Sequence, residues 1–217
     1  MTRQSMTQNP GPEAPRTPAQ LYLVIPAYRS PEDLTAVLEA GDVACMLLLA
    51  TGLDQSTLHK AIARLRPPAQ ERGVAFLLQD QAALAVETGC DGVHLSDPKG
   101  YKHARRLLGE DVTIGVGCGA SRHAAMEAAE EGADYIAFGA PEPEPAGADP
   151  ELLAWWQAVM IPPCVAFGAA SPEDCAALSA AGADFVALEA AVWSHPEGAP
   201  AGLSACARAL AEQAESA

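Results

Sequence analysis

A short phrase, in which glycine is followed one or two residues later by aspartate, recurs four times along the chain, each time before an apolar run. The four copies are Gly41-Asp42, Gly89-Cys90-Asp91, Gly132-Ala133-Asp134 and Gly182-Ala183-Asp184. Glycine ends a helix at low cost because it tolerates positive φ, and the apolar run that follows predicts a buried strand. Intervals of roughly 45 to 50 residues fit two strand–helix units each. Four intervals therefore predict eight units and favour a closed barrel.

Strand and helix patterns alternate along the whole chain after residue 19. Apolar runs predict strands at about 21–25, 43–49, 74–78, 92–95, 112–116, 135–139, 164–168 and 185–188. Helical patterns predict a helix capped by Ser30 and others at about 55–65, 81–88, 100–108, 121–131, 150–159, 172–181 and 200–214. Such alternation predicts an α/β fold, a single (β/α)8 TIM barrel over residues 20–217. Residues 1–19 are rich in proline and poor in large apolar side chains, which predicts a disordered tail.

Composition narrows the classes of function. The chain has 217 residues, 49% of them apolar, and a net charge of −15. A nucleic-acid partner is not expected, because phosphate neutralisation needs clustered Lys and Arg. The six cysteines show no close spacing, so a zinc site is not expected. We expect a reducing, cytoplasmic location, in which the cysteines stay free. The sequence contains no apolar run of about 18 residues, so a membrane-spanning segment is not expected. Ala-rich helices and the pair Trp155-Trp156 suggest a homodimer.

Candidate catalytic residues follow the strands, because a barrel of this kind carries its site at the carboxyl ends of its strands. Asp80 and Asp97 follow adjacent strands and could share Mg²⁺; alternatively, Asp80 caps the next helix and Asp97 caps a turn. His94 lies within the fourth strand and could point into the barrel or toward the helices. Cys118, between two glycines at a strand end, is the cysteine whose position suits a reactive thiolate.

A small-residue loop, Gly168-Ala169-Ala170-Ser171, opens a helix after the seventh strand. Backbone N–H groups in such a loop can hold a phosphate. Glu173 and Asp174 already occupy the first helical turn, and Glu189 follows the eighth strand, so carboxylates would compete with the anion. The proline- and glutamate-rich segment 141–147 after the sixth strand carries no cation and is predicted to form a rigid lip.

Longer stretches carry a family resemblance. They are Gln79-Asp80 followed by ALAVETGCDGVHLSD, then RRLLGEDVTIGVG, EEGADYIAFGAPEPEP and CVAFGAASPEDCAALSAAGADFVALEAAV. With these stretches the chain resembles thiamine-phosphate synthase and its relative, the thiazole tautomerase. The resemblance implies a (β/α)8 enzyme of thiamine biosynthesis, which joins a pyrimidine diphosphate to a thiazole phosphate with Mg²⁺ and releases pyrophosphate.

The resemblance also implies roles for individual residues. It implies a metal-ligand role for Asp80 alone, because Lys99 stands where the family has its second metal carboxylate. Asp97 as the second metal ligand, and Asp80, His94 and Cys118 as catalytic residues, are expected from their positions in the chain. A small phosphorylated metabolite would be bound by Gln79, Gly139, Gly168, Ala169 and Ala190. The chain departs from the family in two cationic motifs: Leu47-Leu48-Leu49-Ala50-Thr51 replaces Gln-x-Arg-x-Lys, and the loop after the sixth strand has no lysine.

These departures leave three interpretations open. The chain is a synthase with altered ligand contacts, or an isomerase of the tautomerase kind that uses His94, His123 or Cys118 for acid–base chemistry, or a non-catalytic barrel that binds a metabolite.

Overall fold

Eight parallel strands close into one barrel in the computed structural model, which describes residues 18–141 and 145–216. The strands are β1 (Gln20–Ile25), β2 (Val43–Leu48), β3 (Ala75–Gln79), β4 (Gly92–Leu95), β5 (Thr113–Gly119), β6 (Tyr135–Phe138), β7 (Cys164–Ala169) and β8 (Phe185–Leu188). Their order around the barrel is their order in the chain, and β1 closes the ring by pairing Leu21 with Val186 of β8. The predicted (β/α)8 TIM barrel is confirmed.

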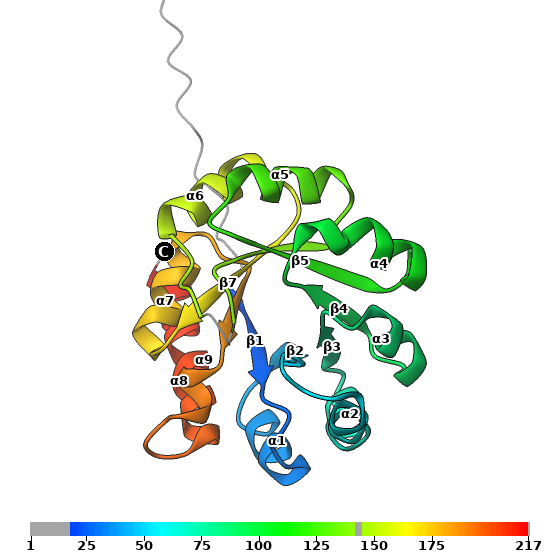
Figure 1. Ribbon diagram of the computed structural model, residues 1–217. Helices are drawn as coiled ribbons and strands as arrows, with labels where there is room; N and C mark the ends of the chain where they lie inside the picture. Colours follow the sequence, from blue (N-terminus) through cyan, green and yellow to red (C-terminus); the bar gives the residue numbers. More distant parts are fainter. Residues whose placement is uncertain (1–17, 142–144, 217) are drawn as a thin grey trace, which may run out of the picture.

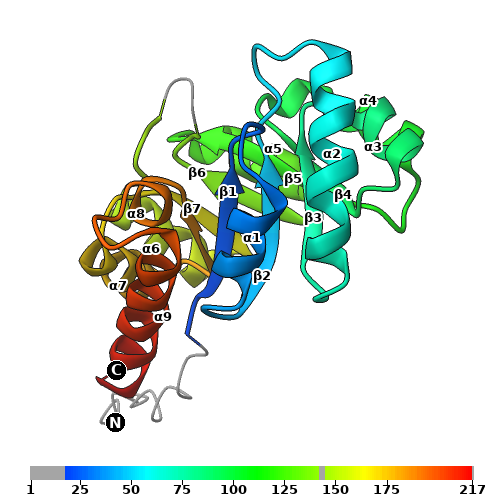
Figure 2. The same cartoon turned by 90° about the horizontal axis from the view of Figure 1, so that it is seen from below.

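Helices form a layer outside the strands (Figure 1). They are α1 (Pro31–Leu38), α2 (Gln55–Gln70), α3 (Ala82–Thr88), α4 (Tyr101–Leu108), α5 (Arg122–Glu130), α6 (Pro150–Val159), α7 (Pro172–Ala181), α8 (Ala190–Trp193) and α9 (Ala199–Ser216), with a 3₁₀ turn, η1, at Pro98–Gly100. The long helix α9 packs along α7 and also touches α1 (Figure 2). Within the described residues, no helix has both the length and the apolar character to cross a membrane.

The glycine–aspartate phrase has a structural role at the amino ends of the strands. The carboxylate of Asp91 accepts a hydrogen bond from the N–H of Phe76, and Asp134 and Asp184 do the same for the N–H groups of Ile114 and Cys164, each at 2.7 Å. Each aspartate precedes an even-numbered strand and binds the start of the odd-numbered strand before it. The phrase thus ends a helix and also ties neighbouring strands together.

The starts of two helices lie where the sequence predicts them, whereas the end of one helix does not. Ser30 and Ser171 both form the hydrogen bonds of a capping box, with aspartate three residues later. Helix α2, expected to end near residue 65, continues through Pro67 and Pro68 to Gln70. Proline removes helical hydrogen bonds, but burial of Leu65 and Ala69 against the barrel continues across the prolines and stabilises the extra turn.

The boundaries of the barrel differ slightly from those expected. Residues 1–17 of the predicted tail lie outside the described residues, whereas Ala19 is buried and its N–H donates to Ser179 Oγ at 3.3 Å. Trp156, named above in connection with a dimer, is buried in the core, and its indole N–H donates to Pro162 O at 2.8 Å. Its role is therefore packing. The barrel interior is a separate cluster that includes Tyr22, Tyr135 and Phe167.

Candidate functional site

Two adjoining cavities open at the carboxyl ends of the strands. The first, about 350 Å³ in volume, is here named the histidine pocket; its lining includes Thr51, Gln79, Asp80, His94, Ser96 and Gly139. The second, about 330 Å³, is named the arginine pocket; its lining includes Tyr28, Arg29, Gly168, Ala169, Glu189 and Ala190. Ala140 and Pro141 line both. The two pockets thus share a wall.

Gln79 is fixed at the base of the histidine pocket. Its side chain is 2% exposed, and its Oε1 accepts from Ala50 N at 3.0 Å and from both the N–H and the hydroxyl of Thr51, at 3.3 and 3.0 Å. The amide Nε2 donates to Ser96 Oγ at 3.4 Å. Because the oxygen already accepts three hydrogen bonds, Nε2 is the part of the amide that is available to donate to a ligand.

Asp80 is the one non-glycine residue with a left-handed backbone among the described residues, with a φ of 54°. This conformation is strained for most side chains, and such residues gather at functional sites. Its Oδ1 accepts from Ser96 N at 2.7 Å. The alternative that Asp80 caps the next helix is wrong, because the N-cap of α3 is Gln81, which has no side-chain cap bond.

Asp97 does cap a turn, as the sequence suggested: its Oδ1 accepts from Lys99 N at 2.9 Å at the start of η1. It lies on a third hollow, between α3 and α4, together with Asp80 and His103. Asp80 therefore borders both the histidine pocket and the hollow that holds Asp97. Among the described residues, no three His, Cys, Asp or Glu side chains gather as a metal site.

His94 points into the barrel, which decides between the two orientations that the sequence allowed. Its Nδ1 lies 3.0 Å from the hydroxyl of Tyr135, and its ring is stacked on the Tyr135 ring, with centroids 5.8 Å apart. Burial lowers the pKa of the imidazole to about 4, although the Asp80 carboxylate acts in the opposite direction. At neutral pH the side chain is therefore uncharged.

Neither Cys118 nor His123 lines one of the two pockets, although Gly117 and Gly119, on either side of Cys118, line the histidine pocket. Cys118 is buried, its Sγ donates to Val116 O at 3.7 Å, and burial raises the pKa of the thiol to about 12. It is a neutral thiol at pH 7, not the reactive thiolate considered from the sequence. His123 is an exposed residue of α5 that lies 3.4 Å from Glu127. Of the three acid–base candidates, His94 alone lines a pocket.

Arg29 brings a cation to the mouth of the barrel; from the sequence it was expected at the rim, after the first strand, but with no specific role. Its guanidinium lies over the ring of Trp193, 4.6 Å from the centroid, and 5.1 Å from that of Tyr28. Its Nε is buried without a hydrogen-bond partner among the described residues. Arg64 holds the loop by donating to the backbone oxygens of Arg29 and Ala27. The position of Arg29 just after β1 was the signal in the sequence.

The backbone N–H groups just before α7 are hydrogen-bonded to a side chain of the same helix. Asp174 Oδ2 accepts from the backbone N–H groups of Ala170 and Ser171, each at 3.0 Å. These amides are therefore engaged within the protein, and a phosphate near Gly168 and Ala169 would have to use other donors. Within the segment 141–147 that was expected to form a lip, residues 142–144 lie outside the described residues, and Ala140 and Ala146 bridge it at 2.9 and 3.1 Å.

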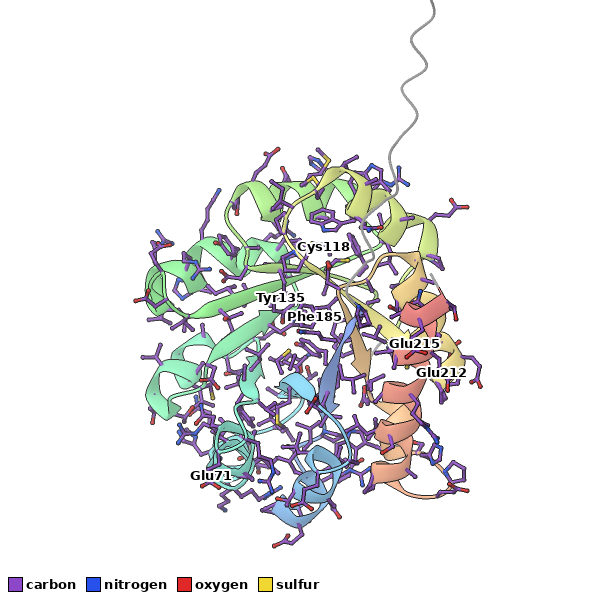
Figure 3. The ribbon with its side chains drawn as sticks, turned by 180° about the vertical axis from the view of Figure 1, so that it is seen from behind. Glu71, Cys118, Tyr135, Phe185, Glu212 and Glu215 are labelled. Atoms are coloured by element: carbon purple, nitrogen blue, oxygen red, sulfur yellow. The ribbon has the colours of Figure 1, made fainter. Side chains whose placement is uncertain are left out.

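Figure 3 shows where this interior lies in the molecule. Tyr135 and Phe185 are near the middle of the barrel, whereas Glu71, Glu212 and Glu215 stand at the periphery. Tyr135, whose hydroxyl contacts His94 of the histidine pocket, thus belongs to the barrel interior, and the three labelled glutamates lie outside it.

Comparisons with known proteins agree with one another. A family model described as thiamine monophosphate synthase matches residues 21–192. The chain is 46% identical over 198 residues to a thiamine-phosphate synthase of Rhodospirillum centenum, covering 87% of this chain and 96% of the relative. It is 42% identical over 208 residues to that of Hyphomonas neptunium, covering 88% and 93%. A thiamine phosphate pyrophosphorylase from Pyrococcus furiosus shares the fold, with a TM-score of 0.77 at 20% identity over 89% of this chain and 96% of that one.

Proposed function

Since the chain belongs to the thiamine monophosphate synthase family, as its match over residues 21–192 shows, we propose that it is a thiamine-phosphate synthase. In this reaction the ring nitrogen of a thiazole phosphate bonds to the methylene carbon of a pyrimidine diphosphate, and the bond from that carbon to the diphosphate breaks. The products are thiamine phosphate and pyrophosphate.

The observation that carries this proposal is the pair of adjoining pockets. A condensation needs both substrates held so that the reacting atoms meet, which contributes a large part of the acceleration. The histidine and arginine pockets have similar volumes, about 350 and 330 Å³, and share Ala140 and Pro141. The product, two rings joined by one methylene carbon, would span that shared wall.

The two pockets differ in chemistry, which supports assigning one substrate to each. The histidine pocket offers the Gln79 amide, the Ser96 hydroxyl and a neutral imidazole, groups that suit the ring nitrogens and amino group of a pyrimidine. The arginine pocket offers the guanidinium of Arg29, which suits a phosphate, although the carboxylate of Glu189 lines the same pocket and opposes an anion.

Asp80 and Asp97 are the residues that would hold Mg²⁺. They lie on one hollow, and each uses Oδ1 for a backbone hydrogen bond, so Oδ2 is the oxygen that would face a cation. Two carboxylates are too few for an all-protein cage, but they fit the usual Mg²⁺ site, in which waters and substrate phosphates complete the shell. When bound, the ion would neutralise charge that develops on the leaving diphosphate.

Charge in the histidine pocket makes this synthase dependent on the ion. No lysine or arginine is among the described residues that line the pocket, and Asp80 adds a negative charge. We therefore expect weak binding of the diphosphate without Mg²⁺.

The test is direct. The purified full chain is incubated with 4-amino-5-hydroxymethyl-2-methylpyrimidine diphosphate, the thiazole phosphate and Mg²⁺, and thiamine phosphate is measured. We expect turnover that Asp80→Asn lowers by about a hundredfold, in line with the loss of one electrostatic contact to a transition state. Glu212→Gln, on the exposed face of α9, is the matched control and should leave the rate unchanged.

Absence of product would overturn the proposal. If both substrates then raised the melting temperature without turnover, the chain would be a barrel that binds these metabolites and does not join them.

One observation favours a second function, an isomerase of the tautomerase kind. His94 is buried and neutral, lines the pocket and is anchored through Nδ1, which suits a group that moves a proton between two atoms of one substrate. Exchange of deuterium from D₂O into the thiazole phosphate, followed by NMR, tests it. Exchange that His94→Gln abolishes, without synthase turnover, would make this the function.

A further inference from the structure

Three aromatic side chains form a hydrogen-bonded series inside the barrel. The hydroxyls of Tyr22 on β1 and Tyr135 on β6 lie 3.0 Å apart, and the Tyr135 hydroxyl lies 3.0 Å from Nδ1 of His94 on β4. All three residues are at least nine-tenths buried. Phe167 packs against Tyr22 and His94, with ring centroids at 6.0 and 5.5 Å. The series runs from the floor of the barrel to the histidine pocket.

Two glycines of β5 leave the space that this series needs. A Cβ at Gly115 would lie 1.8 Å from Cζ of Tyr135, so no other residue fits there without displacing the ring. A Cβ at Gly117 would lie 3.4 Å from Nε2 of His94. Gly117 and His94 both line the histidine pocket, so Nε2 is the ring nitrogen on the pocket side.

The direction of the hydrogen bonds follows from counting donors and acceptors. Tyr22 has one hydrogen-bond partner among the described residues, the hydroxyl of Tyr135. A buried O–H without an acceptor is costly, whereas an unused lone pair costs less, so Tyr22 donates to Tyr135. The Tyr135 proton is then directed to Nδ1 of His94, which must accept. An imidazole whose Nδ1 accepts a hydrogen bond has its one ring proton on Nε2, so the hydrogen bonds alone fix the tautomer.

We propose that Tyr22 and Tyr135 hold His94 in the Nε2–H tautomer, so that His94 presents a hydrogen-bond donor to its ligand in the histidine pocket. Tyr135 is a positioning residue, and Tyr22 acts through it. The ligand class, a heteroaromatic ring with an unprotonated ring nitrogen such as the aminopyrimidine, rests on the proposed function; the tautomer does not. The Gln79 amide is a second donor in the same pocket, so a ring with two acceptors fits it best.

The tautomer is measured directly by ¹⁵N NMR of the histidine-labelled full chain at pH 7.5. His94 is assigned by its loss in His94→Gln. We expect Nε2 to resonate as a protonated nitrogen and Nδ1 as an unprotonated one. In Tyr135→Phe, both signals should move toward the average of the two tautomers, because Nδ1 loses its donor. Tyr22→Phe should cause a smaller shift in the same direction, since the Tyr135 hydroxyl is then free to accept.

Tyr101→Phe is the matched control. Its hydroxyl accepts from Arg105 Nε at 3.2 Å on α4, outside the barrel, so its loss should leave the His94 signals unchanged. Protonation at Nδ1 in the unmodified chain, or unchanged His94 signals in Tyr135→Phe, would overturn the proposal. If Tyr135→Phe fails to fold, the spectrum of the unmodified chain decides alone.

A second measurement separates this inference from the proposed function. Calorimetry with the aminopyrimidine monophosphate should give a Kd that Tyr135→Phe raises about threefold to tenfold, the effect of one hydrogen bond. An Nε2–H tautomer without binding of this probe would support the role of Tyr22 and Tyr135 in fixing the tautomer. It would overturn the assignment of the pocket to a pyrimidine. Binding with the opposite tautomer would do the reverse.

Discussion

His94 combines three properties: it is buried, it is neutral, and one ring nitrogen borders a cavity while the other is hydrogen-bonded to Tyr135. Its exposure is 1%, and burial lowers its pKa to about 4. An uncharged imidazole both donates and accepts, so the residue can bind a ring nitrogen without placing a charge beside it.

The lowered pKa predicts acid sensitivity. The unfolded chain binds a proton at His94 near pH 6.5, and the folded chain binds it only near pH 4, so the free energy of unfolding falls as pH falls between these values. The loss attributable to His94 is about 3 kcal/mol. Urea titrations at pH 7 and pH 4.5 of the unmodified chain and of His94→Gln measure it, and the variant should lose less stability over this interval.

Comparing the two chains is necessary because other groups titrate as well. The pKa of His59 is raised by its bond to Gln55 O, so this residue acts in the opposite direction. Equal pH dependence in both chains would contradict a buried neutral His94.

At the scale of elements, three aspartates of the repeated phrase stabilise strands and have no catalytic role. Each of Asp91, Asp134 and Asp184 accepts a hydrogen bond from the first or the second backbone N–H of a neighbouring strand. Asp42 makes no such hydrogen bond among the described residues, so its substitution serves as a control for substitution of the other three.

Asp184→Ala should therefore lower the free energy of unfolding by about 1 to 3 kcal/mol, because the N–H of Cys164 loses a charge-assisted hydrogen bond. Asp42→Ala, the matched control, should change it by less than about 0.5 kcal/mol. Chemical denaturation of both variants measures the difference. Equal losses would mean that the phrase only ends helices.

The same phrase explains why the fold could be predicted. Its spacing gave eight strands in the right order, and the bounds of α6, α7 and β8 agree with the sequence pattern. Helix α2 was mispredicted because packing outweighed the local effect of two prolines. The four-residue helix α8 was too short to leave a periodic pattern.

The candidate site was less predictable, for a physical reason. All four residues of β4 are buried, so the alternation that separates inward from outward side chains is missing, and the sequence could not orient His94. The strained backbone of Asp80 and the stacking of Arg29 on Trp193 depend on residues far apart in the chain. The aspartate that closes the start of α7 was visible in the sequence as a helix cap.

At the scale of the whole molecule, the barrel presents two pockets that share a wall, the polar histidine pocket and the arginine pocket, which contains Arg29 and Glu189. Arg29 belongs to the second, so Arg29→Gln should raise the KM for the thiazole phosphate by about tenfold and change the KM for the pyrimidine diphosphate little. Steady-state kinetics with each substrate varied in turn measure both constants.

Arg122→Gln is the matched control, since Arg122 also covers a tryptophan, Trp155, at 4.8 Å, but lies on α5 outside both pockets. A larger effect of Arg29→Gln on the pyrimidine diphosphate would contradict the assignment of the arginine pocket to the thiazole phosphate.

The central claim is that the two pockets hold the two halves of one product, and a crystal structure with thiamine phosphate bound tests it most directly. We predict the pyrimidine ring in the histidine pocket with a ring nitrogen beside Nε2 of His94, and the phosphate in the arginine pocket near Arg29. A product bound elsewhere, or the phosphate lying beside Asp80, would contradict the account.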